Sequence, residues 1–306
     1  MDNKINKKHF SKIGFRLFWG TIIIVVLQLI GSIVVGAINP KLLENYDISL
    51  ASTMIPLYLI GLPIMILLLK KVDYQKIEQK SMSGKELLSA ALMSYAIVIL
   101  GNFLGLGITA LISLVKGEGV INPFVEIASN GNLWITAVYT VICAPIYEEI
   151  IFRKLLVDRT IKYGEKAAVI FSGVVFALFH GNLNQFVYAL LIGMFFAFIY
   201  VKTGQVKYCI ILHMVVNFLG SVFGSIIMTY FDAEKTFGMI VHSLYSVLFY
   251  AMIISGIVIL IKSLKKFKLE AGQLEKAQGF KTMFINAGMI VYSVFWIANM
   301  VILLLA

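Results

Sequence analysis

Long apolar runs separated by short polar segments make up most of this chain. Nine of these runs are predicted to be helices, at 17–37, 50–70, 87–115, 133–157, 167–181, 186–201, 207–230, 237–262 and 282–306. About 20 apolar residues, rising about 1.5 Å each, cross a hydrocarbon core about 30 Å thick. The pattern therefore predicts membrane-spanning helices. A β-barrel would instead show runs of about 10 residues with alternating polarity.

The composition agrees with this interpretation. Hydrophobic residues make up 60% of the chain and charged residues only 14%, whereas a soluble globular domain has about 25% charged residues. We therefore expect an all-α, polytopic transmembrane bundle of about eight to nine helices. Because the sequence contains no internal repeat and no soluble segment of domain size, residues 1–306 are expected to form a single membrane domain.

The distribution of basic residues predicts the topology. Of the 26 Lys and Arg residues, all but Lys41, Lys116 and Lys235 fall in segments that lie inside if the N-terminus is cytoplasmic. This bias predicts nine crossings with the C-terminus outside. The net charge of +10 is therefore interpreted as a topology signal, and nucleic acid is not an expected partner. The first apolar run is too long for a signal-peptide core and is expected to be retained, with a cleaved signal ending near Ala37 as the alternative.

The stretch from Pro145 to Arg153 contains the most costly side chains in the predicted membrane region. Of the 16 acidic residues, only Glu148 and Glu149 lie inside an apolar run, where a charge costs about 3 kcal/mol or more. Helical spacing places Glu149 and Arg153 on one face, as a structural ion pair, and turns Glu148 about 100° away, where it can face a cavity and act as a base. Pro145 cannot donate a helical hydrogen bond, so we expect the helix to kink or loosen beside Glu148.

Two further helices carry pairs of residues at the same i,i+4 spacing: the apolar Phe176 with His180, and the polar His213 with Asn217. Counted at about 1.5 Å per residue from the inferred cytoplasmic ends, Glu148 lies about 13 Å deep, His180 about 20 Å, His213 about 9 Å and Asn217 about 15 Å. Polar groups on three helices thus share one slab of the membrane, which predicts a single intramembrane site. Interhelical hydrogen bonding is the alternative explanation for these side chains.

These motifs resemble the signature of the CAAX-prenyl-protease and bacteriocin-processing (Abi) intramembrane endopeptidases, which is EExxxR, then FxxxH, then HxxxN. The resemblance covers roughly residues 87–230 and leaves the helix at 282–306 as an extra element without a role. It implies a glutamate-type protease in a bacterial cell membrane, acting on a peptide or membrane-associated protein near the cytoplasmic face. It further implies that Glu148 and His180 activate a water molecule, and that His213 and Asn217 stabilise the oxyanion.

Chemistry agrees with these roles, because peptide hydrolysis needs a general base and donors aimed at the developing oxyanion. Glu149, Arg153 and Phe176 are interpreted as support for the site. No cofactor is favoured, although the family was long described as metalloproteases. Zinc held by Glu148, His180 and His213 therefore stays open, without an HExxH helix to favour it.

Other interpretations compete with a protease. A proton-coupled transporter could use the same Glu and His residues, but it would usually show paired half-repeats, and none is found. A non-catalytic scaffold is a further alternative. Cys209 lies one turn before His213 and could form a Cys-His dyad, but a buried cysteine is usually an inert small hydrophobe. His242 is interpreted as a helix-packing group and His9 as part of the basic N-terminal tail.

Overall fold

The computed structural model describes residues 3–120, 130–270, 272, 274 and 276–305. Every regular element in this part of the chain is helical, which confirms the all-α class. Eight helical stretches are long and apolar enough to cross a membrane, so the chain is an integral membrane protein. These stretches are Lys4–Ile38, Tyr46–Lys70, Gly84–Lys116, Leu133–Tyr163, Leu183–Thr203, Val206–Tyr230, Thr236–Lys266 and Ala287–Leu305.

Several of these stretches are divided by wider turns. The α-helices are α1 (Asn3–Ile38), α2 (Tyr46–Pro56), α3 (Leu62–Lys70), α4 (Gly84–Lys116), α6 (Leu133–Ala137), α7 (Ala144–Glu148), α8 (Leu156–Thr160), α9 (Glu165–Phe179), α10 (Leu183–Thr203), α11 (Val206–Asn217), α12 (Gly224–Tyr230), α13 (Thr236–Ser263), α14 (Lys276–Phe284) and α15 (Ala287–Leu305). Segments of π-helix lie at Leu57–Gly61, Val138–Cys143, Glu149–Leu155 and Phe218–Phe223, and 3₁₀ turns at Pro40–Glu44, Ile161–Tyr163 and Leu264–Lys266.

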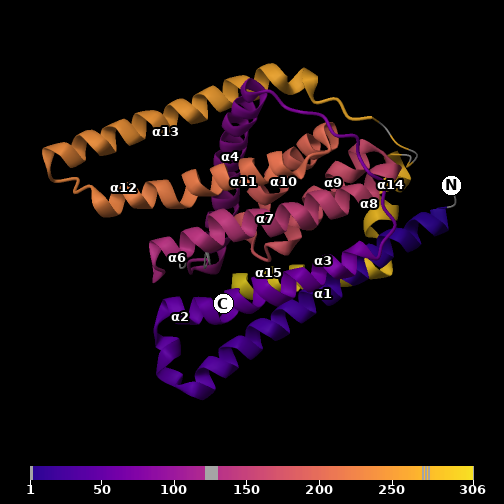
Figure 1. Ribbon diagram of the computed structural model, residues 1–306, viewed down its shortest axis with the longest axis horizontal. Coiled ribbons are helices and arrows are strands. Elements are labelled where there is room, and N and C mark those ends of the chain that lie inside the picture. Colours follow the sequence, from indigo (N-terminus) through magenta and orange to yellow (C-terminus); the bar gives the residue numbers. More distant parts are fainter. Residues whose placement is uncertain (1–2, 121–129, 271, 273, 275, 306) are drawn as a thin grey trace.

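The helices form three groups across the bundle (Figure 1). On one side, α1 packs against α2, α3 and α15, and on the other side α4 packs against α13. Between them lie α7 to α11, where α10 contacts both α9 and α4. The three sequence motifs lie on helices of this middle group, so the site is shielded by helices on both sides.

The first helix begins earlier than predicted. α1 starts at Asn3 rather than near residue 17, because Phe10, Ile13 and Leu17 recur at helical spacing and are all fully buried. His9 is therefore not part of a tail, and this interpretation was wrong. Its Nε2 donates a hydrogen bond to the carbonyl oxygen of Arg159 at 2.9 Å. The basic N-terminal segment is thus packed against the short helix α8.

The predicted helix at 167–181 is present as α9, but it is short. Its 15 residues span only about 22 Å, which is less than the thickness of a hydrocarbon core, and it is not among the eight stretches. The chain turns at Gly181, where φ is +64°, and α10 begins two residues later at Leu183. The turn at the end of α9 lies inside the bundle, since Asn182 and Asn184 directly after it are both buried.

The predicted last helix at 282–306 is two helices. α14 ends at Phe284 and α15 begins at Ala287, because Asn286 accepts a hydrogen bond through Oδ1 from the Met289 backbone N–H at 3.1 Å. An asparagine in this position is a helix N-cap, which starts a new helix rather than continuing the old one. Ala306, the predicted last residue of the helix, lies outside the described residues.

We expect labelling experiments to place the N-terminus inside and the C-terminus outside, because nearly all basic residues lie in the segments assigned to the cytoplasm. In a chain without its own cysteines, Lys4→Cys should react with an impermeant maleimide only from the cytoplasmic side, and Leu305→Cys only from the outer side. Lys265→Cys, in the basic segment after α13, is the control for cytoplasmic access. Labelling of both ends from the same side would contradict this topology.

Candidate active site

Glu149 and Arg153 form a fully buried ion pair within the site. Nε of Arg153 lies 2.9 Å from Oε2 of Glu149, and both side chains are completely buried. The guanidinium group makes no hydrogen bond to the described residues. Instead, its central carbon lies 4.2 Å from the ring centroid of Phe176 and 5.6 Å from that of Phe196. The arginine of the first motif is thus stabilised by a carboxylate and by the phenylalanine of the second motif, through a cation–π contact.

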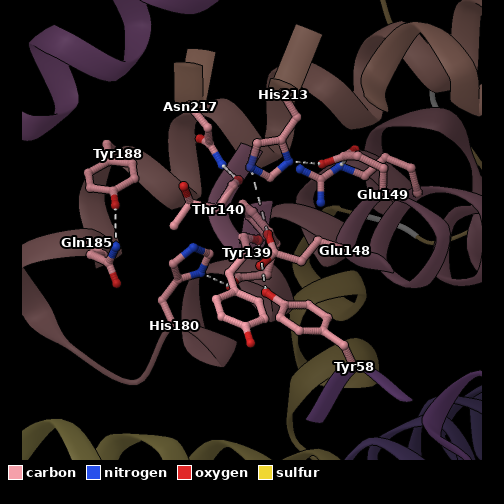
Figure 2. A network of polar contacts seen from close by, with 12 residues as sticks. Tyr58, Tyr139, Thr140, Glu148, Glu149, His180, Gln185, Tyr188, His213 and Asn217 are labelled. Carbon is pink, nitrogen blue, oxygen red and sulfur yellow. Dashed lines mark hydrogen bonds and ion pairs between the residues drawn. The ribbon is translucent and has the colours of Figure 1, made fainter. Parts of the chain in front are cut away.

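His213 connects the third motif to both carboxylates of the first (Figure 2). Its Nδ1 donates a hydrogen bond to Oε1 of Glu149 at 2.8 Å. Its Nε2 lies 3.9 Å from Oε2 of Glu148. Helical spacing could pair Glu149 with Arg153, but it could not reveal this partner, which is 64 residues away. Glu149 therefore orients the imidazole as well as neutralising the arginine.

Glu148 has a different environment from its neighbour. Its side chain is 18% exposed, against 0% for Glu149, and it has no hydrogen-bond partner among the described residues. In Figure 2 a dashed line joins its carboxylate to the His213 ring. The two adjacent carboxylates thus differ as predicted in direction, with one held in an ion pair and the other left available.

His180 lies just after the last residue of α9. Its Nδ1 lies 2.9 Å from the carbonyl oxygen of Phe176, and because a carbonyl can only accept, this nitrogen carries the proton. In the neutral ring the lone pair is then on Nε2, which can accept a hydrogen bond from water. The ring of Phe176 packs edge-on against the imidazole, with centroids 4.6 Å apart. In Figure 2 the His180 ring lies in the same region as Glu148 and Asn217.

The side chain of Asn217 is held by a hydrogen bond to a backbone carbonyl that Pro145 cannot bond. In the π-helical segment before α7, the Ala144 N–H donates to the carbonyl of Tyr139, five residues back. The next donor in this pattern would be Pro145, which has no N–H. The carbonyl of Thr140 is instead bonded by Nδ2 of Asn217 at 2.8 Å. The proline thus leaves a carbonyl free, and the third motif binds it.

The predicted loosening beside Pro145 is present as π-helix on both sides of α7, at Val138–Cys143 and Glu149–Leu155. A further π-helical segment, Phe218–Phe223, begins directly after Asn217. Such segments are rare and are found mostly at functional sites. The apolar pattern gave no sign of the segment after Asn217, because the extra residue in each wide turn does not alter the composition of the run.

The structure also adds residues that the motifs did not contain. The hydroxyl of Tyr58, on a separate helical stretch, donates to the carbonyl of Tyr139 at 3.3 Å. Gln185 donates to the hydroxyl of Tyr188 at 2.6 Å. Asn182 is the N-cap of α10, since its Oδ1 accepts from the Gln185 backbone N–H at 2.9 Å. In the sequence, only the Asn and Gln residues directly after His180 indicated the contacts made by Asn182 and Gln185.

Two alternatives can be compared with this geometry. Among the described residues, no group of three or more His, Cys, Asp or Glu side chains is arranged to hold a metal ion. Cys209 donates through Sγ to the carbonyl of Phe196 at 3.3 Å and is not bonded to His213. His242 donates through Nε2 to the carbonyl of Phe231 at 2.8 Å, which agrees with its interpretation as a packing group.

Residues 130–219 match the family model Rce1-like, which is described as type II CAAX prenyl endopeptidase Rce1-like. The matched segment contains all three motifs, from Glu148 to Asn217, and confirms the resemblance that these motifs indicated. No curated protein and no solved structure is significantly similar to the chain. The helices before residue 130 and after residue 219 are therefore outside the family match, although they surround the site.

Proposed function

We propose that this CAAX-type endopeptidase hydrolyses a peptide bond in a peptide or membrane-associated protein near the cytoplasmic face, by a glutamate-type mechanism without a metal ion. The observation that carries the proposal is the contrast between two neighbouring carboxylates. Glu149 is fully buried and contacts both Arg153 and His213. Glu148 is partly exposed, without a hydrogen-bond partner among the described residues, and faces His213. One carboxylate is structural, and the other is available as a base.

Glu148 and His180 are proposed to activate the water molecule. An ionised Glu148 accepts a proton from the water as it attacks the scissile carbonyl. Nε2 of His180 can accept the second water hydrogen, because Nδ1 already donates to Phe176. The water is then oriented by two acceptors, with an oxygen lone pair directed at the carbonyl carbon. Glu148 afterwards returns the proton to the leaving amine, and this completes the hydrolysis.

His213 and Asn217 are proposed to stabilise the oxyanion. Asn217 has a second amide hydrogen besides the one bonded to Thr140. His213 can donate to an oxyanion only if Nε2 carries a proton, and Nδ1 already donates to Glu149. The ring must then be doubly protonated. In that state the site contains two carboxylates, one guanidinium and one imidazolium, so its charges balance, as a buried group of ions requires.

The activity can be tested on membranes. Cells with the active protein should contain cleaved forms of membrane peptides that are absent from cells without it, and the purified protein in a bilayer should cleave the same peptides. The new carboxyl terminus should carry one oxygen from isotopically labelled water. A protein that is folded and embedded but leaves every membrane peptide intact would favour a scaffold instead.

Turnover should survive exhaustive chelation, because a carboxylate, an imidazole and a water molecule are sufficient for general-base attack. We expect the rate after treatment with a strong zinc chelator to equal that of the untreated protein, with no stoichiometric metal found by elemental analysis. A known zinc protease treated in parallel shows that chelation was complete. Stoichiometric zinc whose removal abolishes turnover would contradict the metal-free mechanism.

Asn217→Ala should lower kcat by about 10² to 10³, the usual loss for one oxyanion donor, while the substrate still binds. Because Nδ2 also bonds the Thr140 carbonyl, we expect an additional loss of stability of about 1 to 3 kcal/mol. Ser221→Ala is the matched control, since Ser221 lies one turn further along and donates to the Asn217 carbonyl. Equal turnover by Asn217→Ala and Ser221→Ala would remove Asn217 from the proposed mechanism.

A further inference from the structure

The end of α9 poses a problem that the family match does not explain. The last carbonyl groups of a helix have no partner within the helix, and in a bilayer each unsatisfied backbone group costs several kcal/mol. α9 ends at Phe179, inside the bundle, and the residue that follows is the catalytic candidate His180. Its backbone groups must therefore find partners in other parts of the chain.

Part of the solution is local. The Phe176 carbonyl accepts from Nδ1 of His180 at 2.9 Å, and the His180 carbonyl accepts from Nδ2 of Asn182 at 3.0 Å. The Leu178 carbonyl accepts from the Gly181 backbone N–H at 3.0 Å. The imidazole thus caps its own helix, and this bond fixes which ring nitrogen holds the proton. The orientation of the catalytic ring depends on the backbone of this turn.

Two further hydrogen bonds to this end of α9 and to the turn after it come from α15. Nδ2 of Asn299 donates to the Gly181 carbonyl at 2.8 Å across 118 residues of sequence. About one turn before the end of α9, the hydroxyl of Tyr292 donates to the Val175 carbonyl at 3.1 Å. The ring of Trp296 packs against that of Phe179, with centroids 5.4 Å apart. One face of α15 therefore contacts the helix end on which His180 lies.

Gly181 shows how closely α15 approaches. With φ at +64°, it adopts a backbone conformation that favours glycine, and a Cβ there would lie 2.7 Å from a ring carbon of Trp296 and 2.8 Å from Nδ2 of Asn299. The tryptophan covers the turn, and the asparagine bonds it. A side chain at this position would have to displace the Trp296 ring and the Asn299 amide.

We infer that α15 is a positioning helix for His180, in which Asn299 and Trp296 hold the turn at Gly181 so that Nδ1 of the imidazole stays bonded to the Phe176 carbonyl and Nε2 faces the water. The inference rests on the proposed function for the role of His180. It assigns a task to the helix that the motifs left without one, and that lies outside the matched residues 130–219.

The test compares Asn299→Ala with Asn299→Gln and Ile297→Ala in the full-length protein in a bilayer. A displacement of the ring by about 1 Å can cost about 10²-fold in rate, so we expect Asn299→Ala to lower kcat about 10- to 100-fold per folded molecule, with KM unchanged. Asn299→Gln keeps the amide donor and should recover most of the rate. Ile297 lies on the opposite, half-exposed face of α15, and its truncation should leave kcat unchanged.

A second readout does not depend on proteolysis. In protein with ¹⁵N-labelled histidine, assigned by comparison with His180→Gln, we expect the His180 signal to report a proton on Nδ1 in the wild type and in Ile297→Ala, and a mixture of both tautomers in Asn299→Ala. If the wild type cleaves no peptide, the proposed function fails, while the tautomer still tests the positioning. Trp296→Leu should also give a mixture of both His180 tautomers. If Asn299→Ala does not fold, this variant tests whether α15 positions the imidazole.

The inference would be overturned if Asn299→Ala kept both the wild-type kcat per folded molecule and a single His180 tautomer. It would also be overturned if activity fell only in proportion to the amount of folded protein, with Asn299→Gln no better than Asn299→Ala. In that case α15 would stabilise the bundle without orienting the imidazole.

Discussion

Glu148→Gln should abolish turnover while leaving the protein folded and able to bind its substrate. The glutamine has nearly the same shape but cannot accept the water proton, and a general base typically contributes about 10² to 10⁴ in rate. Because Glu148 has no hydrogen-bond partner among the described residues and makes no ion pair closer than 3.9 Å, its replacement removes no close contact. The measurement is kcat and KM of the purified protein, with thermal unfolding of the same sample.

Glu165→Gln is the matched control for this substitution. Glu165 is also a glutamate, and it pairs with Lys202 at the start of α9, away from the site. It should retain normal turnover, with at most a slightly lower unfolding temperature, since an ion pair of this exposure contributes little. Normal turnover by Glu148→Gln would contradict the assignment of the protease site to these residues.

Arg153→Ala should have the largest effect on folding. It leaves Glu149 fully buried with no cation except His213 beside it, and breaking a buried pair in this way costs about 3 to 5 kcal/mol. The substitution also removes the guanidinium from between the rings of Phe176 and Phe196, which leaves a cavity. We expect a large loss of folded protein after extraction from the membrane, measured by size-exclusion chromatography and by thermal unfolding.

A double-mutant cycle separates the charge from the cavity. In Glu149→Gln/Arg153→Ala no unpaired charge remains, so the double variant should be more stable than Arg153→Ala alone. A glutamine can still accept the Nδ1 hydrogen bond of His213. If Arg153→Ala were harmless while Glu148→Gln unfolded the protein, the roles given to the two adjacent carboxylates would be reversed.

The positions of the helices could be predicted from the sequence because they depend on local composition. A run of about 20 apolar residues can satisfy its backbone in a bilayer only as a helix, so the predicted runs at 87–115 and 207–230 correspond to α4 and to the stretch Val206–Tyr230. The errors fell where a packing contact, rather than composition, decided the boundary. α1 extends back to Asn3 because Phe10 and Ile13 pack inside the bundle, and the last helix is broken by the Asn286 cap.

The different directions of the Glu148 and Glu149 side chains could also be predicted from the sequence, because they depend only on local helix geometry. Residues four apart in a helix face the same way and adjacent residues do not, so the contact between Glu149 and Arg153 and the different direction of Glu148 follow from the spacing alone. The three motifs fixed the chemical groups that could meet, and their similar predicted depths indicated one site. Nothing in this reasoning required knowing which helices are neighbours.

Only the tertiary structure decided how these groups are connected. His213 bonds Glu149 across 64 residues, Asn217 bonds the carbonyl that Pro145 leaves free, and Asn299 bonds the turn after His180 across 118 residues. Apolar helices in a bilayer carry almost no pattern that specifies their neighbours, because lipid is as apolar as the side chains that face it. The sequence alone therefore determined which polar residues lie within the apolar runs, while the helix packing determined the partners of these residues in other helices.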